Sequence, residues 1–150
     1  EGASDIQSQM DWIYNYFKLK NDYYFVIEKI EGVKPIGLIG IYDIKNSKAE
    51  WGRWILKEGN NFAVESVLLL YRLAFKILNL EKIFCRTILS NKSVISFHDS
   101  CGLKQKRLLK NNILMKDKFY DAIQHTLNKK DWEKVDQKLD KLAYLIHKKK

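Results

Sequence analysis

The residues best placed for chemistry in this sequence form a short turn, Gly59-Asn60-Asn61, between a strand pattern and a long apolar helix pattern. A chain that breaks at a Gly/Asn turn and opens directly into a helix leaves the first backbone N–H groups of that helix without intrahelical partners. Together with the positive end of the helix dipole, these groups form a site for an anion such as phosphate. The turn is therefore a candidate phosphate site, and the alternative interpretation is an ordinary turn that binds nothing.

Two elements must position this turn, a strand expected at 49–56 and a helix expected at 63–79. Aromatic and β-branched residues suit the first to a half-buried strand, and the apolar run of the second is too long for one strand. A further strand is expected at 81–89, and a strand–helix–strand crossover makes its two strands parallel. The polar residues of the helix fall on one narrow stripe, which predicts a helix covered on most sides: Glu65, Arg72, Lys76 and Asn79.

Upstream of this unit, the sequence predicts a helix followed by an antiparallel meander. Ser4 or Asp5 can cap the helix. Its apolar side chains recur at helical spacing: Ile6, Met10, Ile13, Tyr14 and Phe17. Strands are expected at 23–30 and 36–44, joined by a hairpin turn. Two glycines in the second of these strands indicate a bulge or a close approach of another backbone: Gly37 and Gly40.

Downstream, the sequence predicts a short helix, a pair of strands and a closing helix. Asn91 can cap the short helix, and Gly102 suits its left-handed C-terminal position. The strands are expected at 103–109 and 118–127. A regular apolar face, with lysines on the outer side, predicts an amphipathic helix over 131–150.

Composition limits the class of protein. At 150 residues and 46% hydrophobic, without repeats or linkers, the chain is sized for one domain, 1–150. No apolar run reaches membrane-spanning length, and the start lacks a signal-peptide pattern, so we expect no membrane partner. Cys85 and Cys101 lack metal-ligand spacing, so we expect no metal and a cytoplasmic location, with a disulfide as the minority alternative. The net charge of +9 fits nucleic acid, a membrane surface or an anionic small molecule, but no base-reading motif favours nucleic acid.

The order of these elements, with Asn91 followed by Gly102-Leu103, resembles the GNAT superfamily of acetyl-coenzyme A-dependent N-acetyltransferases. Leu103 stands where the family usually has an aromatic residue. The turn is similar to the family's pyrophosphate loop, written Gln/Arg-x-x-Gly-x-Gly/Ala, in the register 58–63. The resemblance implies an α+β fold with a mixed, mostly antiparallel central sheet, a βαβ crossover, helices on both faces and an extra C-terminal helix. It also implies a first strand and helix that the given chain begins without.

The chain departs from the loop pattern at two positions. Glu58 replaces the family's cationic or amide residue, and Asn61 replaces a glycine, although Asn tolerates left-handed backbone geometry better than most residues. Within the superfamily, the sequence looks most like bacterial acetyltransferases of nucleotide-linked amino sugars, the pseudaminic-acid type. The residues that carry this likeness are Ser8, Trp12, Glu50, Trp51, Gly52, Trp54, Ile55, Leu56, Lys57, Asn91, Asp121 and His125.

The resemblance implies that acetyl-coenzyme A is the cofactor and that an amine attacks its thioester directly. In the family, adjacent strands splay beyond the loop-bearing strand, and the pantetheine arm pairs with the exposed backbone. The cofactor-binding residues that follow are Trp54, Ile55, Leu56, Gly59, Asn60, Asn61, Phe62, Ala63 and Asn91. The alternative for the strand residues is ordinary core packing, and for Asn91 a helix cap; both can hold together with a cofactor contact.

Two residues are candidates for catalysis by the same resemblance. His98 stands where many relatives carry a tyrosine that protonates the coenzyme A sulfur, and imidazole titrates near neutral pH. Glu50 starts the central strand, where relatives place a carboxylate that takes the amine's proton. The alternatives are a plain hydrogen-bonding histidine and a cross-strand charge pair. Cys101 has no base in evident reach and is interpreted as a packed residue.

Four residues are candidates for binding the acceptor. Trp51 could stack on a ring, and Arg53 could meet a sugar-nucleotide phosphate, while Asp121 and His125 share one strand face and could reach the same pocket. The alternative is that strand alternation divides them between core and solvent. The predicted partner is a small-molecule amine, with a possible homodimer. The alternatives are a ribosomal-protein-type N-terminal acetyltransferase and a binding module of the same fold that has lost turnover.

Overall fold

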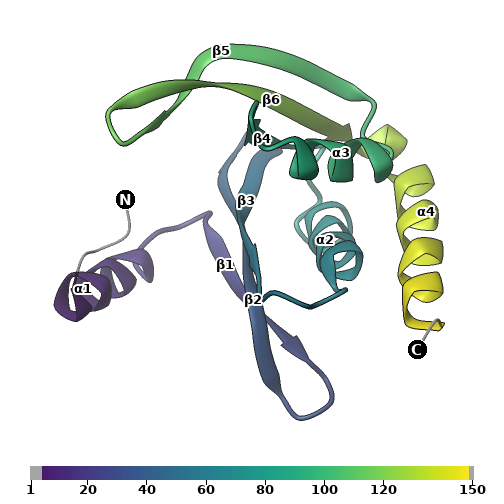
Figure 1. The fold of residues 1–150 in the computed structure, drawn as a ribbon, viewed down its shortest axis with the longest axis horizontal. Coiled ribbons are helices and arrows are strands. Elements are labelled where there is room, and N and C mark those ends of the chain that lie inside the picture. The colour runs from purple at the N-terminus through teal and green to yellow at the C-terminus, as the bar shows by residue number, and fades with distance from the viewer. Residues whose placement is uncertain (1–4, 149–150) are drawn as a thin grey trace.

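The computed structural model describes residues 5–148 as a six-stranded sheet with helices packed against it (Figure 1). The strands, in chain order, are β1 (Tyr23–Lys29), β2 (Lys34–Lys45), β3 (Lys48–Leu56), β4 (Lys82–Ile88), β5 (Gln105–Met115) and β6 (Lys118–Asn128). The helices are α1 (Ile6–Tyr16), α2 (Ala63–Arg72) with its continuation η1 (Leu73–Ile77), α3 (Lys92–Ser100) and α4 (Lys129–Lys148).

The sheet has the order β1-β2-β3-β4-β6-β5, and its strands are antiparallel except for β3 and β4. The antiparallel meander and the parallel pair joined by a helix were predicted from the sequence, and both are confirmed. The parallel ladder is short, because only Lys48–Glu50 of β3 pair with Lys82–Phe84 of β4. Beyond this point the two strands diverge.

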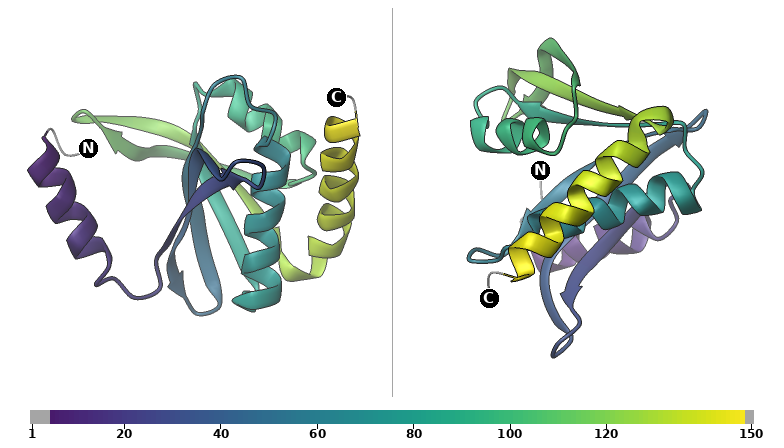
Figure 2. Two further views of the ribbon diagram at one scale, coloured as in Figure 1. Left: turned by 90° about the horizontal axis from the view of Figure 1, so that it is seen from below. Right: turned by 90° about the vertical axis from the view of Figure 1, so that its right-hand side faces the viewer.

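Helices cover both faces of the sheet, as predicted. Figure 2 shows α1 on one side of the sheet and α2 with α4 on the other. On the α2 side, the ring of Trp51 contacts Tyr71 of α2 and His98 of α3, so α3 packs on this face too. The main core lies here, between the sheet and α2, α3 and α4. Its fully buried side chains include Ile41, Trp51, Val67, Tyr71, Ile83, Cys101 and Leu139.

The polar stripe of α2 faces α4. Arg72 donates from Nε to Asp136 at 2.7 Å and from Nη2 to Asp140 at 2.6 Å. Nearer the start of the helix, Glu65 pairs with His147 of α4. The stripe is polar because it meets charged residues of α4, while the apolar face of α4 is buried at Trp132, Val135, Leu139 and Ala143. The helix is regular only to Arg72 and ends in a π-helical turn, a shorter α-helix than predicted.

Helix α1 forms where expected but lacks the buried apolar face that its spacing predicts. Asp5 caps it by accepting a hydrogen bond from the backbone N–H of Ser8, whereas Ser4 lies outside the described residues. No residue of α1 is buried. Its contact with the sheet is aromatic, through the rings of Trp12 and Tyr16 against Tyr24. Helical periodicity predicts an apolar side but not whether another element covers it.

Two further predictions concern strand geometry. At Gly37, a Cβ would lie 2.3 Å from the carbonyl oxygen of Ile55, so the predicted close backbone approach is confirmed. The terminal hairpin is longer than predicted, because β5 continues to Met115 through an irregularity between Leu109 and Ile113. The consecutive polar residues Lys110, Asn111 and Asn112 interrupt the apolar alternation, which hid this part of the strand.

Candidate active site

The candidate active site is the opening between the diverging strands β3 and β4. Glu50 is the last residue of β3 in the parallel ladder, and β3 continues to Leu56 without a ladder partner on the β4 side. Backbone N–H and C=O groups are strong hydrogen-bonding groups that are rarely left unused. The divergence therefore offers Trp54, Ile55 and Leu56 as an edge on which an extended ligand could pair.

His98 reaches across this opening from α3. Its ring lies 5.3 Å from the ring of Trp51 and 6.4 Å from that of Trp54, both on β3. On the other side it lies 5.1 Å from the ring of His125 on β6. The side chain is 2% exposed. Burial, and secondarily the charge of His125, lower the pKa of His98 to about 4, so the ring is neutral at physiological pH.

Polar atoms without partners gather around His98. Within residues 5–148, five buried side-chain atoms lack a hydrogen-bond partner: Trp51 Nε1, Trp54 Nε1, Tyr71 OH, His98 Nδ1 and His125 Nδ1. All five belong to rings in contact with Trp51 or His98. Buried polar groups are normally satisfied, and a cluster of exceptions calls for a ligand or a function. A thioester arm with amide and carbonyl groups fits these atoms chemically.

The predicted phosphate turn leads into α2 as expected. The left-handed backbone conformation falls on Gly59, although the sequence suggested it for Asn61. Gly59 has φ +77°, whereas Asn61 is not left-handed. Asn60 donates its side-chain amide to the carbonyl of Lys57 at 2.7 Å, which holds the turn. Helix α2 begins at Ala63 without a side-chain cap, so the end of its dipole faces the turn.

Helix α3 begins at the predicted cap. Asn91 Oδ1 accepts from the backbone N–H of Val94 at 3.3 Å, and Gly102 ends the helix with φ +95°. The backbone N–H of Leu103 donates to the carbonyl of His98, which completes the left-handed cap. These two caps fix the short helix that carries His98.

On the other face of the sheet, Glu50 is held by Arg86. The carboxylate accepts from Arg86 Nε at 2.8 Å and from Nη2 at 2.7 Å, and Glu50 is 5% exposed. This arrangement is the cross-strand charge pair that the sequence left open as the alternative to a catalytic base. Arg86 also donates to Asn112 of β5, so it links three strands.

Arg53 lies on the face of α1, not beside Trp51. It forms two hydrogen bonds with Asp22, at 2.8 and 3.2 Å, and its guanidinium lies 4.3 Å from the centre of the Tyr42 ring. Tyr16 of α1 lies at 5.8 Å. Arg53 has φ +49°, an interruption of regular strand geometry that sends Trp51 and Arg53 to opposite sides of the sheet.

The predicted acceptor pocket is therefore not assembled from the four residues named for it. Trp51 is 2% exposed and packs in the core, so it has no free face for a substrate ring. His125 is fully buried beside His98, and Asp121 accepts from the backbone N–H of Asn111 in the β5 irregularity. The positive φ of Arg53 separates it from Trp51, so these residues are divided between the core and the opposite face of the sheet, the alternative that the sequence left open.

Three residues around the site were missed: Tyr42, Arg86 and Asp99. Arg86 pairs with a residue 36 positions away, and Asp99 pairs with His125 from another element. Neither pair leaves a local signature in the sequence. The charged residue at 86, which follows the apolar run 83–85 of the strand, was the available signal.

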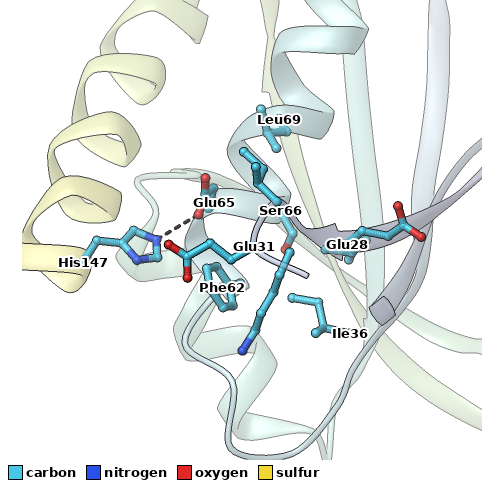
Figure 3. Close-up of a pocket in the computed structure, with 11 residues that line it drawn as sticks. Glu28, Glu31, Ile36, Phe62, Glu65, Ser66, Leu69 and His147 are labelled. Carbon is cyan, nitrogen blue, oxygen red and sulfur yellow. Dashed lines mark hydrogen bonds and ion pairs between the residues drawn. The ribbon is translucent and has the colours of Figure 1, made fainter. Parts of the chain in front are cut away.

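A separate pocket of about 460 Å³ lies between the β1–β2 hairpin, the start of α2 and the end of α4 (Figure 3). Figure 3 shows His147 facing Glu65 at its side, with Glu31 and Phe62 nearby. It shares no lining residue with the cluster around His98. This pocket is therefore not the opening between β3 and β4.

Cys85 and Cys101 are free and buried. No group of three or more His, Cys, Asp or Glu side chains within 5–148 is placed to hold a metal ion. None of the described helices combines the length and apolar character needed to cross a membrane.

Comparison with known families settles the class of protein. A family model for the acetyltransferase (GNAT) domain matches residues 2–104. The chain belongs to this family. It is an acetyl-coenzyme A-dependent N-acetyltransferase that acts on an amine, and its sheet has the mixed α/β arrangement of the GNAT fold. Among curated proteins, no sequence matches this chain significantly.

Solved structures of the spermidine/spermine N-acetyltransferase SpeG from Vibrio cholerae are similar to this GNAT chain. Mutant forms align with a TM-score of 0.77 at 19% identity, covering 89% of this chain and 82% of that chain. The complex with CoA and spermine gives 0.76 at 20% identity, with 89% and 81% covered. A dodecameric structure in an intermediate state gives 0.75 at 19%, with 88% and 79% covered. At 19–20% sequence identity, this similarity shows a shared fold only. Membership of the pseudaminic-acid type of acetyltransferase stays a prediction.

Proposed function

We propose that acetyl-coenzyme A binds in the opening between β3 and β4, with its pyrophosphate at the turn before α2. The support is the end of the parallel ladder at Glu50, together with the five unpartnered polar atoms around His98. The backbone of Trp54, Ile55 and Leu56 would hold the pantetheine arm. Gly59, Asn60, Asn61, Phe62 and Ala63 would surround the pyrophosphate, with Asn91 at the start of α3. Bound there, the cofactor supplies an activated acetyl thioester.

In this proposal His98 acts as the proton donor for the departing sulfur. Its ring lies in the opening, and burial keeps it neutral. A neutral imidazole carries one N–H donor and one acceptor nitrogen, so its N–H can donate a hydrogen bond to the departing sulfur. Full transfer of that proton requires the acceptor nitrogen to gain a proton in the same step. A donor at this point offsets the cost of releasing a thiolate into a buried site.

Glu50 is proposed to take the proton of the attacking amine, directly or through water. Strand alternation places it on the face opposite Trp51, so an amine would approach from the side of α1. Arg86 fixes the carboxylate through two hydrogen bonds. The amine and the thiol would then lie on opposite faces of the sheet. The proton taken from the amine and the proton given to the sulfur would therefore be transferred at separate places.

The acceptor is proposed to be a nucleotide-linked amino sugar. The carboxylates of Asp22 and Glu50, on the face of α1, are already paired with Arg53 and Arg86. A polycation would meet two guanidinium groups there, whereas a phosphate would be attracted to them. The net charge of +9 likewise attracts a phosphate-bearing acceptor and repels a polycation. A polyamine is the second candidate, because a fold neighbour was solved with CoA and spermine.

An acceptor panel tests the proposal. Purified protein is mixed with acetyl-coenzyme A and a nucleotide-linked amino sugar, spermidine or a peptide with a free N-terminus, and release of free thiol is followed. The proposal expects turnover with the amino sugar and a raised KM for it in Arg53→Gln. Faster turnover with spermidine would establish the polyamine instead. Binding of coenzyme A without turnover on any amine would indicate a module that has lost catalysis. Sedimentation of the same protein tests the predicted homodimer.

A further inference from the structure

A continuous surface leads away from Glu50 across the face of the sheet on which α1 lies (Figure 2). Glu50 is opposite Tyr42 in the β2–β3 ladder, so both side chains project from this face. A Cβ on Gly52 would lie 2.8 Å from the Tyr42 hydroxyl, so the phenol lies close over this glycine. In the same way, a Cβ on Gly40 would lie 3.5 Å from Cδ of Arg53. The two glycines therefore let Tyr42 and Arg53 lie low on the sheet, with the guanidinium 4.3 Å from the centre of the Tyr42 ring.

The rings of Trp12, Tyr16 and Tyr24 form an aromatic platform that continues this surface beyond Arg53. The guanidinium lies 5.8 Å from the centres of the Tyr16 and Tyr24 rings. The Trp12 ring stacks on Tyr16 at 5.3 Å, with 19° between the planes, and meets Tyr24 edge-on at 6.4 Å. Trp12 is 49% exposed. One face of its indole is therefore covered by Tyr16, and the opposite face is left for a ligand.

We propose that Trp12, supported by Tyr16, stacks on the base of the nucleotide-linked acceptor while Arg53 holds its phosphates. The inference rests on the proposed function and names the part of the site that binds the nucleotide. The order of groups along the surface matches the order within such a substrate. The amine lies at Glu50, the phosphates lie at Arg53, and the base lies on Trp12. Every nucleoside base has a flat π-face that stacks on an aromatic side chain.

The charges along this surface favour a phosphate-bearing ligand over a polyamine. Asp22 accepts two hydrogen bonds from Arg53, at 2.8 and 3.2 Å, and the guanidinium retains further N–H groups for a phosphate. The rings of Tyr16, Tyr24 and Tyr42 already lie around this guanidinium, so a fixed cation uses their attraction for positive charge. A second cation would be repelled by Arg53, whereas a diphosphate would be attracted.

Binding of nucleoside diphosphates tests the aromatic platform without requiring catalysis. Uridine and guanosine diphosphate carry a base and phosphates, whereas inorganic pyrophosphate carries phosphates alone. Calorimetry measures each affinity with coenzyme A in excess, so that the turn before α2 is occupied. Trp12→Ala should weaken both nucleotides by roughly 5-fold to 20-fold and leave pyrophosphate unchanged, because stacking acts through the base alone. Trp12→Phe keeps an aromatic face and should retain most of the affinity.

Tyr14→Ala is the matched control. The Tyr14 ring is 66% exposed on the same helix and lies under Lys18 Nζ, so its loss should leave all three affinities unchanged. Trp12→Ala should keep the fold, because α1 has no buried residue, and thermal unfolding checks this. In acetyl transfer, Trp12→Ala should raise KM for the nucleotide-linked amino sugar and leave kcat unchanged. The KM of the matching amino sugar 1-phosphate, which lacks a base, should not change.

The outcomes separate the aromatic platform from the proposed function. Base-dependent loss of affinity in Trp12→Ala, with retention in Trp12→Phe, supports the platform. Equal binding of the nucleotides by wild type and Trp12→Ala overturns the platform, and acetyl transfer to the amino sugar would still leave the proposed function standing. Base-dependent loss without acetyl transfer to any amine overturns the proposed function and leaves the platform standing. Spermidine that displaces uridine diphosphate and binds Trp12→Ala more weakly would assign the rings to a polyamine and overturn the platform.

Discussion

The side chains of Glu50 and Arg86 join β3 to β4 at the point where the two strands separate. Glu50 is opposite Phe84 in the last parallel pair, and Arg86 lies two residues further along β4. Their two hydrogen bonds, at 2.8 and 2.7 Å, replace the backbone pairing that ends there. The pair thus fixes the mouth of the opening in which His98 lies, whatever its part in proton transfer.

Removing the Glu50 charge should therefore destabilise the fold. Glu50→Gln leaves the Arg86 guanidinium short of an ionic partner, at a cost of about 2 kcal/mol in the free energy of unfolding. Urea denaturation measures this cost. Glu81→Gln is the matched control, because it breaks an exposed pair with Lys129 and should cost less than about 0.5 kcal/mol. Equal costs for the two variants would contradict a structural role for the Glu50–Arg86 pair.

The buried His98 ring predicts acid sensitivity. Its pKa is lowered from 6.5 to about 4 in the fold, so the unfolded chain binds a proton in this window and the folded chain does not. Stability should therefore fall as pH is lowered from about 6.5 to about 4, by an amount on the order of 3 kcal/mol. In His98→Gln this contribution should be absent. The free energy of unfolding, measured by urea titration at several pH values, should fall in parallel for both proteins below about pH 4. An unchanged slope in the variant would show that other groups cause the sensitivity.

The exposed Glu58 carboxylate should weaken binding of the cofactor. Glu58 stands beside the turn proposed for the pyrophosphate, and an anion at this distance opposes another. Glu58→Arg should tighten coenzyme A binding by roughly 3-fold to 5-fold, as expected for exposed charges near a helix N-terminus. Calorimetry measures the affinity, with Asp117→Asn in the distant β5–β6 turn as a control.

A ligand that lacks the pyrophosphate shows whether Glu58→Arg acts through the pyrophosphate group of coenzyme A. Acetyl-pantetheine should bind wild type and Glu58→Arg equally well. If Glu58→Arg tightened both ligands alike, the turn would not be the pyrophosphate site, and the placement of Gly59, Asn60 and Asn61 in that role would fail.

The pairing of β2 with β3 depends on Gly37. A Cβ at this position would lie 2.3 Å from the Ile55 carbonyl oxygen, which belongs to backbone and cannot move aside cheaply. Gly37→Ala should cost about 2–3 kcal/mol and should disturb the strand proposed to bind the pantetheine arm. Gly32→Ala has open space around it and a φ of +78°, so it should cost only about 1 kcal/mol. Thermal unfolding compares the two, and similar losses would contradict the close approach.

Much of the fold could be predicted from the sequence because its signals are local. The caps at Asp5 and Asn91 and the left-handed Gly102 each act within one turn of helix. Strand patterns at β3 and β4, with an apolar helix between them, are enough to make the pair parallel. The position of the phosphate turn follows from the same three elements.

The candidate acceptor residues could not be placed in this way. One left-handed residue, Arg53, reverses the faces that alternation assigns along β3, so Trp51 lies in the core while Arg53 meets Tyr42 and Asp22. Period-two reasoning fails at such a position because an irregularity changes the face of every residue beyond it.

The sequence by itself determined the order of the elements, the parallel crossover and the GNAT-like pattern, since each depends on neighbours in the chain. The tertiary structure decided which polar groups meet. Glu50 of β3 meets Arg86 of β4, and His125 of β6 meets His98 and Asp99 of α3. The physical reason is that burial and charge pairing depend on distances in space, which no spacing along the chain encodes.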